Sequence, residues 1–224
     1  MLADLQQQNV PSSGHVELGE FVTSVAIKMY KMWTGNDSNV CPVRNEEFKK
    51  FCIEILNLTN LSPVTVFVAL KYLERYMKCY AAIDFGIERL FLISLLIADR
   101  YVNDTFFSIK RWALNTELPP EEINRMQVMI LNNLNYDIYI NGNDYLEWIN
   151  QLSEHIKAEE KLYTDPPKYL KTIMDDIENQ RSLISMKIKT QVHFIKLPSG
   201  IIHRYTPEVQ LPSGIVYRYS PEYK

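Results

Sequence analysis

Residues 90–101 read Leu-Phe-Leu-Ile-Ser-Leu-Leu-Ile-Ala-Asp-Arg-Tyr, and this stretch decides the fold. Its apolar side chains cover almost every direction around a helix, and a helix that is apolar all round belongs in the middle of a bundle. The apolar run ends at Asp99-Arg100, far short of the roughly 20 residues that span a bilayer. The sequence therefore predicts a buried central helix and no membrane span.

Amphipathic segments lie on both sides of this central helix. Apolar residues recur at helical spacing within residues 44–58, 62–80, 106–114 and 119–134. Two of these segments also begin with residues that favour a helix start. The serine of Ser62-Pro63 can cap free backbone amides, and a proline of Pro119-Pro120 suits the first helical position. Together with the central helix, they predict a five-helix unit over residues 44–140.

The remaining segments flank this unit. Residues 1–15 are expected to be a disordered leader, residues 16–35 an amphipathic helix, and residues 141–188 two further helices. Within residues 189–224, Leu197–Glu208 returns fourteen residues later with nine of twelve positions identical. Each copy has Pro-Ser-Gly between β-branched and aromatic residues, which is typical of a hairpin loop. The predicted fold class is all-α with a small C-terminal β-hairpin appendage.

Composition narrows the function. The 224 residues suffice for one sizeable hydrophobic core. The net charge of −3 disfavours nucleic-acid binding, which needs clustered Lys and Arg to neutralise phosphates. Three cysteines without metal-ligand spacing indicate reduced thiols, and the polar N-terminus shows no secretory signal, so we expect an intracellular protein, cytoplasmic and/or nuclear. No phosphate-binding loop, acid/base pair or metal motif is present, which predicts a non-enzyme without a cofactor.

An ordered set of motifs resembles a known family. Ala98-Asp99-Arg100-Tyr101 is followed by Asn103-Asp104, and Arg125–Ile138 runs without a gap to a Leu-x-aromatic-x-Ile ending. These motifs resemble the cyclin box, and Leu70–Tyr76 after Ser62-Pro63 is most similar to the P-type (Pho-type), single-box cyclins. The resemblance covers a little under half of the chain, and the sequence after residue 140 is too short for a second five-helix box.

The resemblance implies a regulatory subunit of a cyclin-dependent Ser/Thr kinase. In cyclins, the third and fifth box helices dock the kinase helix that carries the glutamate of the Lys–Glu ion pair. Arg100 would donate to backbone carbonyls near that helix, with Tyr101, Leu131 and Tyr136 as apolar anchors. Carried over to this chain, the docking residues are Ile97, Arg100, Tyr101, Gln127, Leu131, Tyr136 and Ile138.

One position departs from the cyclin pattern and keeps an alternative open. Gln127 stands where cyclins usually have the glutamate that pairs with the cation of the third helix. Glutamine can still accept a hydrogen bond from Arg100, but the charge-assisted part is lost. The alternative function is therefore a cyclin-fold scaffold that no longer activates a kinase. A DNA-reading factor with a cyclin-like repeat is disfavoured by the charge and by the missing second repeat.

Simpler interpretations accompany each candidate. Arg100 could be a helix-end cation paired with Asp104, and the apolar positions of the docking set could be core residues. Thr206-Pro207 and Ser220-Pro221 have the form that proline-directed kinases phosphorylate, although proline could merely end each strand. The exposed edge of the hairpins offers a surface for self-association or for a partner sheet.

Overall fold

A computed structural model describes residues 13–34, 45–79, 86–190, 193–196 and 202–205. The protein is all-α in class, and the described residues form eight helices followed by two short strands. In chain order these elements are α1 (Ser13–Thr34), α2 (Asn45–Thr59), α3 (Pro63–Cys79), α4 (Ile87–Val102), α5 (Ile109–Thr116), α6 (Pro120–Asn133), α7 (Gly142–Glu160), α8 (Lys168–Thr190), β1 (His193–Lys196) and β2 (Ile202–Tyr205).

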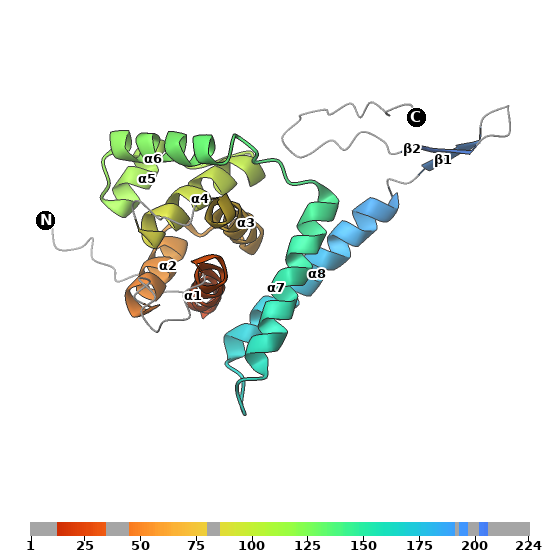
Figure 1. The fold of residues 1–224 in the computed structure, drawn as a ribbon, viewed down its shortest axis with the longest axis horizontal. Coiled ribbons are helices and arrows are strands. Elements are labelled where there is room, and N and C mark those ends of the chain that lie inside the picture. The colour runs from red at the N-terminus through yellow and green to blue at the C-terminus, as the bar shows by residue number, and fades with distance from the viewer. Residues whose placement is uncertain (1–12, 35–44, 80–85, 191–192, 197–201, 206–224) are drawn as a thin grey trace, which may run out of the picture.

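The central helix predicted from residues 90–101 is α4. Every side chain from Leu90 to Asp99 is buried, and α4 lies among α2, α3, α5 and α6 (Figure 1). Phe91 packs edge-on against Phe48 of α2, with ring centroids 6.1 Å apart. Burial on all sides is what an all-apolar helix requires, so the prediction is confirmed.

The start of α3 also follows the prediction. Ser62 Oγ accepts a hydrogen bond from the backbone N of Thr65 at 3.4 Å, and Pro63 is the first helical residue. At the other end of the box, α6 begins at Pro120 with Glu121 and Glu122 in its first turn. Acidic side chains there stabilise the helix, because they lie at the positive end of its dipole.

The short helix predicted over residues 106–114 is displaced. Ser108 caps α5 by accepting from the backbone N of Arg111 at 3.3 Å, so the helix runs from Ile109 to Thr116 and Phe106 lies in the preceding connection. The cause is the buried carboxylate of Asp99. It accepts from the backbone N of Phe107 at 2.9 Å and from the Asn103 side chain at 2.8 Å, which holds the connection away from a helical path.

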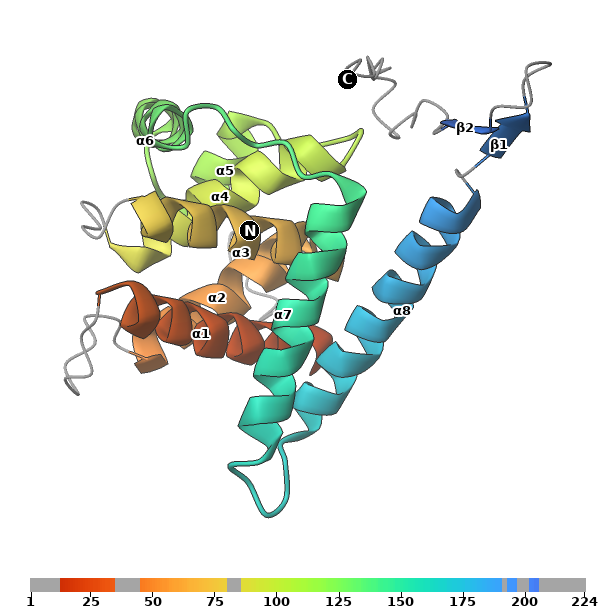
Figure 2. The ribbon, with the colours of Figure 1, turned by 45° about the vertical axis from the view of Figure 1, so that its right-hand side comes forward.

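The flanking helices pack against the box as a second layer. The helices α7 and α8 form an antiparallel pair beside α1 (Figure 2). Trp148 of α7 donates its indole N–H to the carbonyl of Phe67 in α3 at 2.8 Å, which fixes α7 to the box. The helix predicted over residues 16–35 begins earlier, at Ser13, and the second of the two helices predicted within residues 141–188 ends slightly later, at Thr190.

A polar cluster joins α1, α7 and α8. Ser24 Oγ donates to Glu159 at 2.8 Å and lies 2.9 Å from His155 Nε2, while the Tyr169 hydroxyl donates to Glu159 at 2.6 Å. Burial lowers the pKa of His155 to about 4, with Lys28 acting in the same direction and Glu159 opposing it. The imidazole is therefore neutral at pH 7, and the cluster holds the layer together without a buried cation.

Only part of the predicted C-terminal appendage lies within the described residues. The strands β1 and β2 pair antiparallel, with His193 opposite Tyr205 and Lys196 opposite Ile202. The loop between them and the second copy of the repeat, with Thr206 and Ser220, lie outside the described residues. Among the helices described, none is both long enough and apolar enough to cross a membrane.

Candidate functional site

The end of α4 and the outer side of α6 are joined by one hydrogen bond. Arg100 Nη1 donates to Gln127 Oε1 at 3.1 Å, which is the hydrogen bond that a glutamine at this position can accept. The guanidinium carbon also lies 5.7 Å from the ring centroid of Phe106, within the range of a cation–π interaction. Arg100 thus has a neutral oxygen acceptor and an aromatic ring as its neighbours.

The charge of Arg100 has no counter-ion in the part of the chain that the structure describes. No carboxylate there forms an ion pair with Arg100, and this includes Asp104, which the simpler interpretation had paired with it. Arg100 Nε is buried and has no hydrogen-bond partner. Buried donors are normally paired, so this atom is an exception that needs an explanation.

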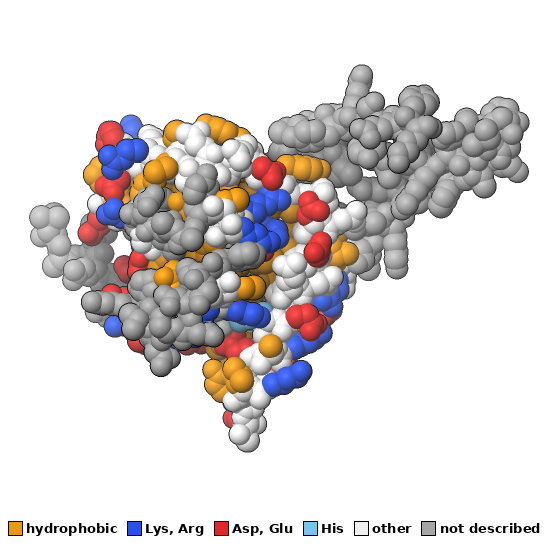
Figure 3. Space-filling model, in the orientation of Figure 1, with side chains coloured by type: hydrophobic (Ala, Val, Ile, Leu, Met, Phe, Trp, Pro, Cys, Tyr) orange, Lys and Arg blue, Asp and Glu red, His pale blue; other side chains and the backbone are white. Residues whose placement is uncertain are grey.

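Exposed apolar side chains lie on the segment that follows α4 and on α6 and its end, the parts of the chain that meet at this cation. Phe106 and Val128 are each 53% exposed, Tyr136 is 61% exposed, and Leu131 is half-buried against the core. Figure 3 shows apolar side chains along the outer edge of the molecule over α6. We call Arg100, Phe106, Gln127, Val128, Leu131 and Tyr136 the α4–α6 surface.

Sequence reasoning missed two residues of this surface. Val128 follows Gln127 directly, and its position on the outer side of α6 could have been found by extending the stripe from Gln127 to Leu131. Phe106 gave no such signal, because it lies in a connection whose path depends on the hydrogen bond from the backbone N of Phe107 to the Asp99 carboxylate.

Tyr136 is held in an uncommon backbone conformation. Asn135 and Tyr136 have φ values of 51° and 56°, in the left-handed region that few residues other than glycine adopt. The Tyr136 backbone N donates to the carbonyl of Leu131 at 2.8 Å, which closes the last turn of α6. Such a conformation persists only where the surroundings fix it, so the backbone sets the direction in which the exposed Tyr136 side chain leaves the chain.

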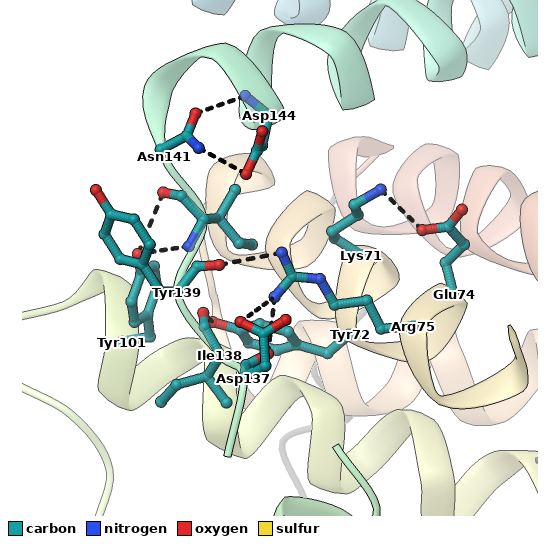
Figure 4. Close-up of polar contacts among 11 residues, drawn as sticks. Lys71, Tyr72, Glu74, Arg75, Tyr101, Asp137, Ile138, Tyr139, Asn141 and Asp144 are labelled. Atoms are coloured by element: carbon teal, nitrogen blue, oxygen red, sulfur yellow. Dashed lines mark hydrogen bonds and ion pairs between the residues drawn. The ribbon is translucent and has the colours of Figure 1, made fainter. Parts of the chain in front are cut away.

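The segment after Tyr136 is held by side chains of α3 and α4 (Figure 4). Arg75 donates from Nη1 to the carbonyl of Asp137 at 2.8 Å and from Nη2 to that of Tyr139 at 3.0 Å. The Tyr72 hydroxyl donates to the carbonyl of Ile138, between them, at 2.8 Å. Burial, together with the nearby Tyr101, raises the pKa of Tyr72, so its hydroxyl remains a donor.

Tyr101 contacts the backbone that follows α6. Its hydroxyl donates to the carbonyl of Ile140 at 3.3 Å and accepts from the backbone N of the same residue at 3.2 Å. Its ring is half-buried and packs edge-on against Tyr72, with centroids 6.2 Å apart. Tyr101 therefore positions the chain, and together with Tyr72 and Arg75 it forms what we call the 137–140 clamp.

Two other predicted docking residues are wholly or partly buried. Ile97 is only 3% exposed and belongs to the core. Ile138 is half-buried against that core, and its carbonyl accepts from Tyr72. Ile97 thus fits the simpler interpretation given to apolar stripes, whereas Ile138 stays partly accessible and its docking role stays a prediction.

The described residues hold no group of three or more His, Cys, Asp or Glu side chains placed to bind a metal ion. Cys52 is a free thiol in the core, where burial raises its pKa, and Cys79 is a free, exposed thiol.

Comparison with known proteins identifies the box. Residues 32–139 match the family model described as "Cyclin, N-terminal domain". The chain carries a cyclin N-terminal domain. Members of the cyclin family regulate protein kinases and are not themselves catalysts. The matched range includes the whole α4–α6 surface and most of the segment held by the 137–140 clamp.

Two curated relatives from Saccharomyces cerevisiae are distantly similar. PHO85 cyclin-1 is 28% identical over 130 residues, which cover 55% of this chain and 47% of that protein. PHO85 cyclin-5 is 24% identical over 107 residues, covering 44% of this chain and 47% of that protein. The match thus spans about half the length of the curated relatives. No solved structure matches the chain.

Proposed function

We propose that this chain is the activating, regulatory subunit of a cyclin-dependent Ser/Thr protein kinase, and that the kinase docks on the α4–α6 surface. The observation that carries the proposal is the arrangement at the end of α4, where a cation with a buried, unpartnered donor lies against the exposed ring of Phe106 and binds Gln127 of α6, which also carries exposed apolar side chains. Aromatic and arginine side chains of this kind supply most of the binding energy in protein interfaces.

Docking would act on the geometry of the kinase. A kinase is active when the helix that carries the glutamate of its Lys–Glu ion pair is held inward. Phe106, Val128 and Tyr136 offer apolar area for that helix, and Arg100 offers N–H groups for carbonyls near it. Removing water from this patch would strengthen each of these hydrogen bonds.

The rigidity of the surface supports the same proposal. The 137–140 clamp and the left-handed backbone at Tyr136 fix the backbone that carries the exposed ring before a partner arrives. A preformed interface loses less conformational entropy on binding. We therefore assign the clamp a positioning role in docking.

The proposed partner follows from the relatives. Both relatives are named as PHO85 cyclins, so we propose for this chain a kinase of the same class as PHO85. We also propose residues 44–140 as the box, with α1, α7 and α8 as flanking layers, and an intracellular location where such a kinase is present.

The test is reconstitution with a kinase. Kinases captured by the chain from its native cells would be purified, and their activity measured with wild type, Arg100→Ala and Tyr136→Ala. The matched control is Leu162→Ala, which removes a side chain that is 80% exposed in the turn between α7 and α8. We expect each surface variant to need at least about tenfold more protein for the same activation, which corresponds to ~1.4 kcal/mol, and the control to behave as wild type.

A scaffold that binds without activating remains the second candidate, and Gln127 is the observation that favours it. The kinase activity would then be the same with wild type, with Arg100→Ala and without the added chain, although the kinase still binds. That result would support the scaffold and refute activation.

A further inference from the structure

The environment of Arg100 points to a specific chemistry in the partner. Of the polar groups described around it, only the neutral Gln127 oxygen accepts a hydrogen bond from the guanidinium. No described carboxylate pairs with it, and Nε is already buried without an acceptor. The cation is therefore partly removed from water before any partner arrives, without a compensating charge.

Docking would make this imbalance larger. A partner that covers Arg100 removes its remaining hydration, and burying an unpaired charge is strongly unfavourable. A backbone carbonyl can satisfy an N–H group but carries no net charge. A carboxylate satisfies the donors and neutralises the cation, and hydrogen bonds between charged groups are shorter and about twice as strong.

We propose that the partner of the α4–α6 surface presents an Asp or Glu side chain to Arg100. This inference rests on the proposed kinase docking and adds the counter-charge that the chain itself does not provide. The position of Gln127 gives it a consequence for specificity. With a glutamate at residue 127, the counter-ion would lie within the chain and a partner with neutral groups would suffice. With glutamine there, the chain selects a partner that has an acidic group at this contact.

The decisive variant is Gln127→Glu, which is nearly isosteric. It supplies Arg100 with an internal counter-ion and brings a negative charge close to the proposed acidic group of the partner. We expect thermal stability to be retained or increased, and the affinity for the captured kinase to fall about tenfold or more, because like charges are juxtaposed at an interface. The loss should shrink as the salt concentration rises.

The control is Gln151→Glu, the same change at an exposed position of α7, which should leave the affinity unchanged. A second variant, Arg100→Met, keeps the aliphatic stem and removes the cation. Combined with Gln127→Glu, it should weaken binding at least as much as either single change.

The outcomes separate this inference from the proposed function. If wild type neither binds nor activates a kinase, the proposed function fails. If wild type binds and activates, but a folded Gln127→Glu variant binds as tightly or more tightly, the acidic contact is wrong and docking stands. A loss of affinity confined to Gln127→Glu and Arg100→Met, and relieved by salt, is the result that the inference predicts.

Discussion

The 137–140 clamp yields a prediction whose size can be worked out from its contacts. Arg75→Met keeps the aliphatic stem of the side chain and removes two hydrogen bonds to backbone carbonyls, at 2.8 and 3.0 Å. A hydrogen bond to a charged group contributes about 1.5–3 kcal/mol. The Arg75 side chain is 19% exposed, and the residues whose carbonyls it binds are exposed, so water can replace part of the loss. We therefore expect the free energy of unfolding to fall by about 2 kcal/mol.

The ion pair of the same arginine should matter much less. Arg75 Nη1 lies 3.8 Å from a carboxylate oxygen of Asp137, but that side chain is 71% exposed. Water screens such pairs, so Asp137→Asn should lower stability by less than about 0.5 kcal/mol. The two variants therefore separate the carbonyl contacts from the charge.

Urea unfolding, followed by far-ultraviolet circular dichroism and tryptophan fluorescence, measures both effects. In a thermal scan, Arg75→Met should lower the melting temperature by about 4–8 °C, given ~2–4 °C per kcal/mol for a protein of this size. An Arg75→Met variant as stable as wild type, or an Asp137→Asn variant equally destabilised, would refute the reasoning about the clamp.

Four further predictions concern other parts of the chain. Glu117 ends α5 with φ 56°, so Glu117→Gly should stabilise the protein by about 1 kcal/mol, and a lower melting temperature would count against this. Burial lowers the pKa of His155 to about 4 from 6.5, so the unfolded chain binds the proton more readily and stability should decline as the pH falls from about 6.5 to about 4. His155→Gln should flatten that part of the stability profile, and an unchanged slope would show that another group causes it. If the activated kinase phosphorylates the tail, mass spectrometry of the complex incubated with ATP should find phosphate on Thr206 and Ser220, whereas unmodified peptides would end that hypothesis. Size-exclusion chromatography of the full chain and of a chain truncated after Lys187 tests self-association through the tail. Self-association predicts an oligomer for the full chain and a monomer for the truncated chain.

Local patterns predicted the architecture of the box well. The apolar stretch before Asp99 could only be a central helix, and Ser62-Pro63 and Pro119-Pro120 marked helix starts through short-range chemistry. The hydrogen bond between Arg100 and Gln127 was also predicted, because the cyclin pattern places these residues opposite each other.

Contacts between distant residues were harder to predict. The sequence did not reveal that the hydroxyl of Tyr101 binds the backbone of Ile140, 39 residues later, and its role as a docking anchor stays a prediction. The contacts of Arg75 could not be predicted, because its acceptors are backbone carbonyls, which every residue type carries. The sequence analysis placed Phe106 in a helix, because helix propensity does not reveal that the buried Asp99 carboxylate accepts a hydrogen bond from the backbone N of Phe107.

The central claim is that a kinase docks on the α4–α6 surface, and hydrogen–deuterium exchange of the chain with and without the captured kinase tests it most directly. Docking predicts new protection in the peptides that cover residues 100–107 and 124–138, with α7 and α8 unchanged. Protection confined to α7 and α8, with no change around Arg100 and Tyr136, would contradict the claim.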